Sequence, residues 1–390
     1  MIYFYRKPNT SWPAIIHTLE SSLSKVLVPF YPVAGRLRSV GGGRFELDCN
    51  GKGAVFVAAE LNPELVDFGD FTPSTKFDQF LIPPIDYSVP IDEVPVLVAQ
   101  FTKFECGGIS LSIAMSHVVA DGKSMANFVA EWARLARGEL LQTAPVLDRK
   151  AFRAGEPPSA VPRFDHSKDF GNHPFLLKLP SAEEVSKMKT TMVRLRLDKG
   201  QVETLKKMAN NQSRGKEARN RAAATSFLIV IDSRSRIRQP SPTGYFGNAI
   251  FDIATCHADD LMSQPLSYGA RKIRGAIEKV TDDYVWSAID FLKNESELTK
   301  FQYSYKSSKI GGGNLLGNPN IGLVNWVNLA FEGMDFGWGK EIYYGPGYHE
   351  IDGDAWLLRG SDDQEGSLAV LLCLLEDHVE DFTKYFYEDL

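Results

Sequence analysis

The chain has 390 residues, of which 44% are hydrophobic and 24% are charged, a composition typical of a folded protein rather than a disordered one. It carries 43 lysines and arginines against 49 aspartates and glutamates, so its formal net charge is −6. This balance argues against a nucleic-acid-binding protein, because such proteins usually present a basic face. At roughly 150 residues per domain, the length indicates two or three domains.

The start of the chain predicts a strand, a helix and a hairpin. The apolar run 2–5 has the pattern of a strand, and its position suggests that a leader segment is missing before it. Residues 15–28 place apolar side chains at a spacing of about 3.6, which predicts an amphipathic helix. Residues 45–47 and 54–58, on either side of an Asn-Gly turn, predict a β-hairpin.

Two strands and a helix are predicted next. Residues 96–104 and 109–116 have strand patterns, and the second alternates apolar and small polar side chains. From Ser124 the period becomes helical, with Ser124 as the expected N-cap and Gly138 as the expected stop.

The rest of the chain predicts a linker and a second half. Residues 151–190 open with proline, charge and histidine without periodicity, so we interpret them as a crossover between an N-terminal half, 1–150, and a C-terminal half, 191–390. The second half predicts strands at 192–197, 227–231, 321–329 and 368–374 and helices at 201–209, 268–280, 283–293 and 377–387. Strands and helices mix without strict alternation, which favours an α/β fold of two layered halves over one doubly wound sheet.

Cysteine usage and hydropathy predict a cytoplasmic protein with no membrane partner. The four cysteines, Cys49, Cys106, Cys256 and Cys373, form no C-x-x-C pair, which predicts reduced thiols packed in the interior. Among the longest apolar runs is 368–375, far short of the roughly 18 residues of a membrane span. The N-terminus lacks the pattern of a signal peptide.

The first candidate motif is 116–122, Ser-His-Val-Val-Ala-Asp-Gly, at the end of an alternating strand. Loops that follow strands present reactive groups on a rigid scaffold, and a histidine can accept a proton near neutral pH. His117 is therefore a candidate general base, with Asp121 four residues later. The alternative is a polar histidine bonded in a turn, with Asp121 capping the next helix.

The second candidate motif is 335–339, Asp-Phe-Gly-Trp-Gly. Its glycines allow a close backbone approach, and the indole of Trp338 is a hydrogen-bond donor. The alternative is a turn with a packed aromatic ring.

These two motifs, together with 27–36 (Leu-Val-Pro-Phe-Tyr-Pro-Val-Ala-Gly-Arg) and 244–248 (Gly-Tyr-Phe-Gly-Asn), resemble in content and order those of the plant BAHD acyl-CoA-dependent acyltransferases. The resemblance spans nearly the whole chain. It implies two similarly folded mixed-sheet halves of the chloramphenicol-acetyltransferase-like type, with a tunnel between them. It also implies a monomer that uses acyl-CoA as co-substrate and holds no permanent cofactor or metal. No G-x-S-x-G elbow, Walker lysine or zinc spacing supports another chemistry.

The resemblance also assigns roles to residues. His117 matches the base that deprotonates the acceptor, and Trp338 matches a residue whose indole N–H can stabilise the tetrahedral oxyanion. Asp335 completes this catalytic set, although within the motif it looks structural, as does Gly337. The remaining expected site residues are the orienting pair Asp121 and Arg234, the structural Gly122 and Gly339, and the CoA-side residues Tyr245, Gly247, Asn248, Ser233 and Arg236.

Within the family, the segments 131–138, 152–158, 164–166, 284–294, 317–322 and 386–389 resemble those of the spermidine hydroxycinnamoyl transferases, with the shikimate or quinate hydroxycinnamoyltransferases as the alternative. Asn328 stands where the shikimate enzymes have an arginine that can pair with the acceptor carboxylate. Glu350, Asp352 and Asp354 form an acidic group that suits the ammonium groups of a polyamine. This predicts acylation of an amine such as spermidine, in phenolamide and secondary metabolism. The alternatives are an alcohol acceptor and, for the acidic group, a solvated loop.

One stretch departs from the family pattern. Family members carry a helix that this chain lacks between about 214 and 226. The missing helix has about two dozen residues, and burying a helix of that length contributes on the order of ten kcal/mol of apolar burial, comparable to the stability of a whole protein. A non-catalytic relative or a truncated, impaired product is therefore the second class of interpretation.

Overall fold

The computed structural model describes residues 1–170, 188–210, 227–238, 243–254, 264–299, 317, 320–360, 366–388 and 390. The expected loss of a helix between 214 and 226 concerns residues that lie outside these ranges. The chain folds as two compact units. Unit 1 comprises Met1–Ala151, Ser241–Asn248 and Asn328–Tyr348, and unit 2 comprises Phe152–Pro240, Ala249–Val327 and His349–Leu390. The chain therefore does not divide at a single point, and the motif at 335–339 belongs to unit 1, whereas the sequence predicts it in a C-terminal half.

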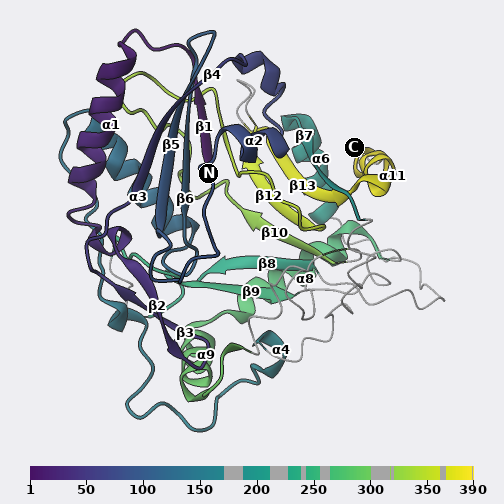
Figure 1. The fold of residues 1–390 in the computed structure, drawn as a ribbon. Helices are drawn as coiled ribbons and strands as arrows, with labels where there is room; N and C mark the ends of the chain where they lie inside the picture. The colour runs from purple at the N-terminus through teal and green to yellow at the C-terminus, as the bar shows by residue number, and fades with distance from the viewer. Residues whose placement is uncertain are drawn as a thin grey trace. The chain divides into compact units, whose positions relative to one another are not determined.

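Unit 1 is built on a five-stranded mixed sheet (Figure 1). Its strands, in spatial order, are β11 (Tyr343–Gly345), β1 (Ile2–Tyr5), β6 (Ile109–Met115), β5 (Leu97–Phe104) and β4 (Val55–Leu61). The apolar run that opens the chain is thus an interior strand, antiparallel to both neighbours, and all four of its residues are buried. The strands predicted at 96–104 and 109–116 are confirmed as the antiparallel pair β5 and β6.

Helices α1 (Trp12–Val26) and α3 (Gly122–Ala136) pack beside this sheet (Figure 1). Their apolar stripes meet the sheet in one cluster, and the buried indole of Trp132 donates a hydrogen bond to Ser22 Oγ at 3.0 Å. The N-cap of α3 is Asp121 rather than the predicted Ser124, because its carboxylate accepts the backbone N–H of Ser124 at 3.0 Å. After the helix, Gly138 adopts the positive φ of 77° that ends many helices, as predicted. The smaller elements of the first 170 residues are η1 (Tyr31–Ala34), η2 (Leu65–Phe68), α2 (Thr75–Phe80), η3 (Arg149–Phe152) and α4 (Ser167–Phe170).

The predicted hairpin between 45–47 and 54–58 is wrong, although both segments are strands. β3 (Arg44–Asp48) instead pairs with β2 (Arg36–Gly41), and β4 joins β5 in parallel. Three consecutive glycines at 41–43 have positive φ angles of 84°, 58° and 70°, so this segment makes the turn that the sequence pattern assigned to Asn50-Gly51.

Unit 2 contains a six-stranded mixed sheet (Figure 1). Its strands, in spatial order, are β7 (Thr190–Leu197), β13 (Leu368–Leu375), β12 (Asp354–Arg359), β10 (Ile321–Asn325), β8 (Phe227–Asp232) and β9 (Ile250–Ala254). Besides α4, its described helices are α6 (Lys199–Asn210), α8 (Leu266–Lys279), α9 (Asp282–Asn294), η5 (Glu376–His378) and α11 (Val379–Tyr387). The predicted strand 321–329 ends at Asn325. Both units thus combine helices with a mixed sheet, which confirms the predicted α/β class.

A buried polar cluster holds α4 in unit 2. His166 places Nδ1 3.2 Å from Asp169 Oδ2 and Nε2 3.0 Å from Ser287 Oγ. Asp169 also accepts a hydrogen bond from Tyr284 Oη at 2.5 Å and pairs with Lys279 Nζ at 3.1 Å. His166 is only 1% exposed, so this Ser–His–Asp chain is enclosed by protein and attaches α4 to α8 and α9.

Candidate active site

His117 lies in a turn just beyond the end of β6. Ser116 still bonds to the neighbouring strand, with its N–H 2.8 Å from Val96 O, and Val119 N–H then closes a turn on Ser116 O at 2.9 Å. His117 is exposed, and within the described part of the chain no hydrogen bond engages its imidazole. A histidine on a rigid strand end with an open ring can take a proton from a bound substrate.

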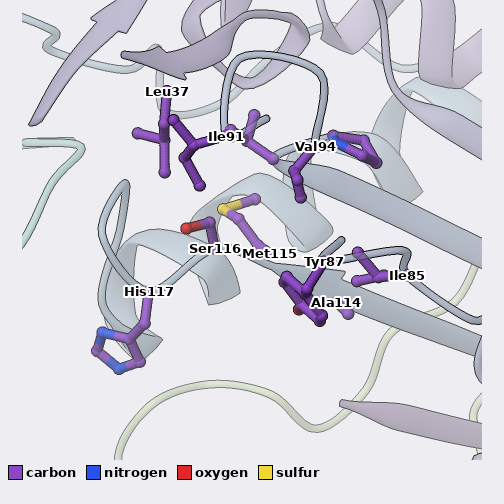
Figure 2. A pocket seen from close by; sticks show the side chains of 11 residues that line it. Leu37, Ile85, Tyr87, Ile91, Val94, Ala114, Met115, Ser116 and His117 are labelled. Atoms are coloured by element: carbon purple, nitrogen blue, oxygen red, sulfur yellow. The ribbon is translucent and has the colours of Figure 1, made fainter. Parts of the chain in front are cut away.

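A pocket of about 260 Å³ adjoins His117 (Figure 2). In this view the side chains of Ile85, Tyr87 and Ala114 gather on one side, and His117 lies at the edge. The full lining is Leu37, Ile85, Tyr87, Ile91, Val94, Pro95, Val96, Ala114, Met115, Ser116 and His117. Apart from His117, these side chains are apolar or hydroxyl-bearing, so the pocket suits the apolar part of a small molecule.

Among the residues that line this pocket, the sequence motifs singled out only His117. Five of the others, Ile85, Tyr87, Ile91, Val94 and Pro95, come from the segment 82–95, which contains four prolines and leads into β5, and this pattern could have revealed them. Because β5 and β6 are antiparallel, residues that precede β5 must meet residues that follow β6.

Asp121 shapes the turn that carries His117. Its carboxylate is 1% exposed and caps α3, as the alternative interpretation of the motif expected. Gly122 follows at the first helical position, where an added Cβ would lie 3.1 Å from Leu329 Cδ1. Arg234, in unit 2, pairs with Asp232 at 2.9 Å, and its expected pairing with Asp121 stays a prediction.

The segment 244–248 is docked on the same turn. Asn248 Nδ2 donates to His117 O at 2.7 Å, and Ser124 Oγ donates to Gly247 O at 2.9 Å. Tyr245 forms a parallel bridge with Val146 and is 6% exposed. Asn248 thus bonds to the His117 turn and Gly247 to the start of α3, whereas Tyr245 pairs with Val146.

The other two predicted CoA-side residues, both in unit 2, also have internal partners. Ser233 is completely buried, and its N–H and hydroxyl both donate to Ala249 O at 2.8 Å. Arg236 Nη1 donates to Ile277 O at 2.8 Å and to Val280 O at 3.3 Å, at the C-terminal end of α8. In the structure, both side chains stabilise unit 2.

The motif at 335–339 forms a tight loop in unit 1. Asp335 Oδ1 accepts the N–H groups of Gly337 at 2.7 Å and Gly339 at 2.9 Å, and these glycines have φ angles of 111° and 101°. Such angles favour glycine, so the structural role expected for Asp335 and both glycines agrees with this geometry. Arg137 adds a hydrogen bond to Asp335 O.

Trp338 belongs to the aromatic cluster of unit 1. Its ring stacks on Phe336 at 5.7 Å and 14°, and contacts Tyr5 at 6.0 Å and Phe101 at 5.8 Å. Its Nε1–H is buried and has no hydrogen-bond partner among the described residues.

This placement separates Trp338 from His117. Tyr5 pairs with Ile109, at the start of β6, whereas His117 follows the end of that strand at Met115. The two ends of β6 are about 20 Å apart at the usual strand rise of about 3.3 Å per residue. A base and an oxyanion donor must both lie within about 3 Å of the reacting group. The oxyanion role of Trp338 therefore stays a prediction, and the packing of its ring against Tyr5 and Phe336 favours a structural role.

The predicted acceptor-side carboxylates belong to residues that make contacts within unit 2. Asp352 Oδ1 accepts the N–H of Leu375 at 3.1 Å, and the carboxylate of Asp354, the first residue of β12, lies 3.1 Å from His349 Nδ1. Glu350 is exposed, and its backbone carbonyl accepts the Thr190 hydroxyl at 3.1 Å. Asn328 is exposed and belongs to unit 1, whereas these carboxylates belong to unit 2.

Neither a metal-binding cluster nor a membrane-spanning helix occurs in the described part of the chain. No group of three or more histidine, cysteine or acidic side chains suited to a metal ion lies within those ranges. Across the same ranges, no helix is both long and apolar enough to cross a bilayer. Cys49, Cys106 and Cys373 are free thiols, but only Cys373 lies in the interior as predicted, because Cys49 and Cys106 are exposed; Cys256 lies outside the described residues.

Comparison with known proteins identifies relatives along the whole chain. The model of the Transferase family matches residues 1–222 and 216–389. The hydroxycinnamoyl-CoA:piscidic acid hydroxycinnamoyltransferase of Actaea racemosa is 40% identical, over 100% of this chain and 92% of that protein. The shikimate O-hydroxycinnamoyltransferase of Nicotiana tabacum is 35% identical, over 99% and 91%. A hydroxycinnamoyl-CoA:5-hydroxyanthranilate N-hydroxycinnamoyltransferase of Avena sativa is 33% identical, over 98% and 90%.

Solved structures share the fold. The crystal structure of vinorine synthase superposes with a TM-score of 0.69 at 24% identity, over 97% of this chain and 87% of that chain. TRI101 of F. sporotrichioides, complexed with coenzyme A and T-2, gives a TM-score of 0.77 at 16% identity, over 99% and 93%. At these identities the likeness establishes the fold alone.

Proposed function

Because the chain belongs to the Transferase family, that of the BAHD acyltransferases, we propose that it acylates a small acceptor with His117 as the general base. It is a CoA-dependent acyltransferase whose relatives transfer hydroxycinnamoyl groups. The observation that carries the proposal is the position of His117, exposed at a strand end and at the edge of an apolar pocket. We also propose that the enzyme is a monomer and is located in the cytoplasm.

In the proposed reaction, the His117 imidazole takes a proton from the acceptor hydroxyl or amine as that group attacks the thioester carbonyl. A C–O or C–N bond forms, the C–S bond breaks, and the imidazolium returns its proton to the departing CoA thiolate. Acyl-CoA supplies the activated carbonyl, so a base and an acceptor held close to it are sufficient for transfer. The apolar lining of the pocket supports binding of an aromatic acyl group there.

The acceptor that we place first is a carboxylic acid. The relatives named above act on piscidic acid, shikimate and 5-hydroxyanthranilate, all of which are acids. The last of these is acylated on nitrogen, so an acidic acceptor is compatible with the amide product that the sequence predicts.

Spermidine is the second candidate. Asn328, in place of the arginine of shikimate enzymes, still favours it. The acidic group favours it less, because Asp352 and Asp354 already have partners within unit 2.

An acceptor panel tests this ranking. The purified chain is incubated with one hydroxycinnamoyl-CoA and with piscidic acid, shikimate, 5-hydroxyanthranilate or spermidine, and released CoA thiol and acylated product are measured. Product with an acid and none with spermidine is expected. A dominant spermidine amide would reverse the ranking, and no CoA release with any acceptor would favour the impaired relative.

A further inference from the structure

We propose that Asn248 is a positioning residue that fixes the main chain of His117, and so the direction of its imidazole. This inference rests on the proposed function, since it gives His117 the role of base. It differs from the sequence-based expectation, in which Asn248 faces CoA.

The side chain of Asn248 bonds the turn at the histidine itself. Its Nδ2 lies 2.7 Å from His117 O and 3.4 Å from Val118 O. Both carbonyls lie beyond the end of β6 at Met115, where the pairing of the sheet has stopped. One amide group, which comes from a segment 131 positions further along the chain, therefore supplies the hydrogen bonds that the sheet no longer provides.

A second set of bonds holds Asn248 in place. Ser124 Oγ accepts the N–H of Gly247 at 3.0 Å and donates to Gly247 O at 2.9 Å, so the residue before Asn248 is clasped at both its backbone groups. Ser124 itself lies in the first turn of α3, capped by Asp121. The turn that carries His117 is thus bonded to Asn248 at its start, and the hydrogen bonds between Ser124 and Gly247 hold its end.

The space around the two hydrogen bonds between Ser124 and Gly247 is limited, which explains why position 247 holds a glycine. Arg149 Nη2 donates to Val119 O at 3.1 Å, in the same turn. A Cβ on Gly247 would collide with the Arg149 guanidinium. The glycine therefore lets the segment at 244–248 and Arg149 reach the turn together.

The backbone is what orients His117. Within the described residues no side chain bonds its imidazole, so its direction depends on the turn and on its own rotamer. A displacement of about 1 Å in a reacting group can cost about 10²-fold in rate. Loss of the Asn248 amide should therefore lower turnover while binding of acyl-CoA is retained.

The test compares Asn248→Ala and Asn248→Asp with Asn294→Ala. Asp keeps the size of Asn but replaces the amide donor with an acceptor. The control removes a similar bond in unit 2, where Asn294 Nδ2 donates to Ser159 O at 2.6 Å. We expect kcat to fall about tenfold or more in both Asn248 variants. The KM for hydroxycinnamoyl-CoA should stay within about twofold of the parent, and melting temperatures should match the control. A raised KM with unchanged kcat would instead support a CoA contact and overturn the inference.

A spectroscopic readout separates this inference from the proposed function. The ¹⁵N imidazole signals of His117, identified by their loss in His117→Ala, should shift in Asn248→Asp and stay in place in Asn294→Ala. Unchanged signals in Asn248→Asp would overturn the positioning role, whether or not the enzyme is catalytically active. Full activity of His117→Ala would refute the proposed function while leaving the spectroscopic result to be judged by itself.

Discussion

Leu97 of β5 pairs with Met115 of β6, which brings the loop that enters β5 and the turn that leaves β6 to the same edge of the unit 1 sheet. Val94 and Ile91 in that loop and His117 in that turn consequently line one pocket. The site thus depends on a strand pairing that joins two segments separated along the chain by both strands. Substitutions of residues that line this pocket can therefore test their contributions to catalysis.

Removal of the proposed base should abolish turnover with little effect on folding. His117→Ala is expected to lose at least ~10²-fold in kcat, because the acceptor would attack without general-base assistance. Its melting temperature should stay close to that of the parent, since His117 is exposed. Thiol release from hydroxycinnamoyl-CoA measures the rate, and His17→Ala, which alters an exposed histidine of α1, is the matched control. Parental activity in His117→Ala would rule out the assignment.

A larger side chain in the pocket should discriminate between acyl donors. Ala114→Leu places a larger side chain in a pocket of about 260 Å³ and so leaves less space for the acyl group. It should reduce kcat/KM about tenfold or more for a hydroxycinnamoyl-CoA. Acetyl-CoA, which lacks the aromatic ring, serves as the internal control and should be affected less. Equal losses for both thioesters would show that the pocket does not hold the aromatic group.

Trp338 should behave as a packing residue. Trp338→Phe keeps an aromatic ring against Phe336 and removes a buried Nε1–H that has no partner among the described residues. Because no such hydrogen bond is lost, kcat should stay within about twofold and the free energy of unfolding should change by only about 1 kcal/mol. Kinetics and urea unfolding provide the two measurements. A fall of about 10²-fold in kcat without a change in stability would instead support the oxyanion role.

Asp169 should make stability depend on pH in the acid range. Burial raises the pKa of Asp169, but hydrogen bonds from His166 and Tyr284 and the charge of Lys279 outweigh it and lower the pKa to about 2. This folded-state pKa lies below the ordinary value of 3.8, so the carboxylate stabilises the folded state above about pH 4. That contribution should disappear as the pH falls from about 4 to about 2.

Asp169→Asn should remove this component. The variant should be less stable than the parent at pH 7 by an amount on the order of 2 kcal/mol, and the difference should shrink toward about pH 2. Urea unfolding at a series of pH values measures it. Parallel stability curves for the two proteins across this range would contradict the assignment.

The sequence by itself determined the elements whose signals are local. The apolar spacing at 15–28 predicted α1, the alternation at 109–116 predicted β6, and Gly138 marked the end of α3. The motif that contains His117 was found in the same way, because a histidine, an N-capping aspartate and a helix-starting glycine lie within a few residues.

Only the tertiary structure decided what those elements meet. β3 pairs with β2 and not with β4, and the three short strands β9, β11 and β12 exist through pairings whose partners lie elsewhere in the chain. Such pairing depends on long-range packing, which no local pattern encodes.

The same reason applies to the contacts of the predicted site residues. Trp338 follows its motif pattern, yet its ring packs with Tyr5, whose strand position relative to His117 could not be read from the sequence. The family resemblance assigns Asn248 to the CoA side, and only the fold shows that its amide lies 2.7 Å from the His117 carbonyl.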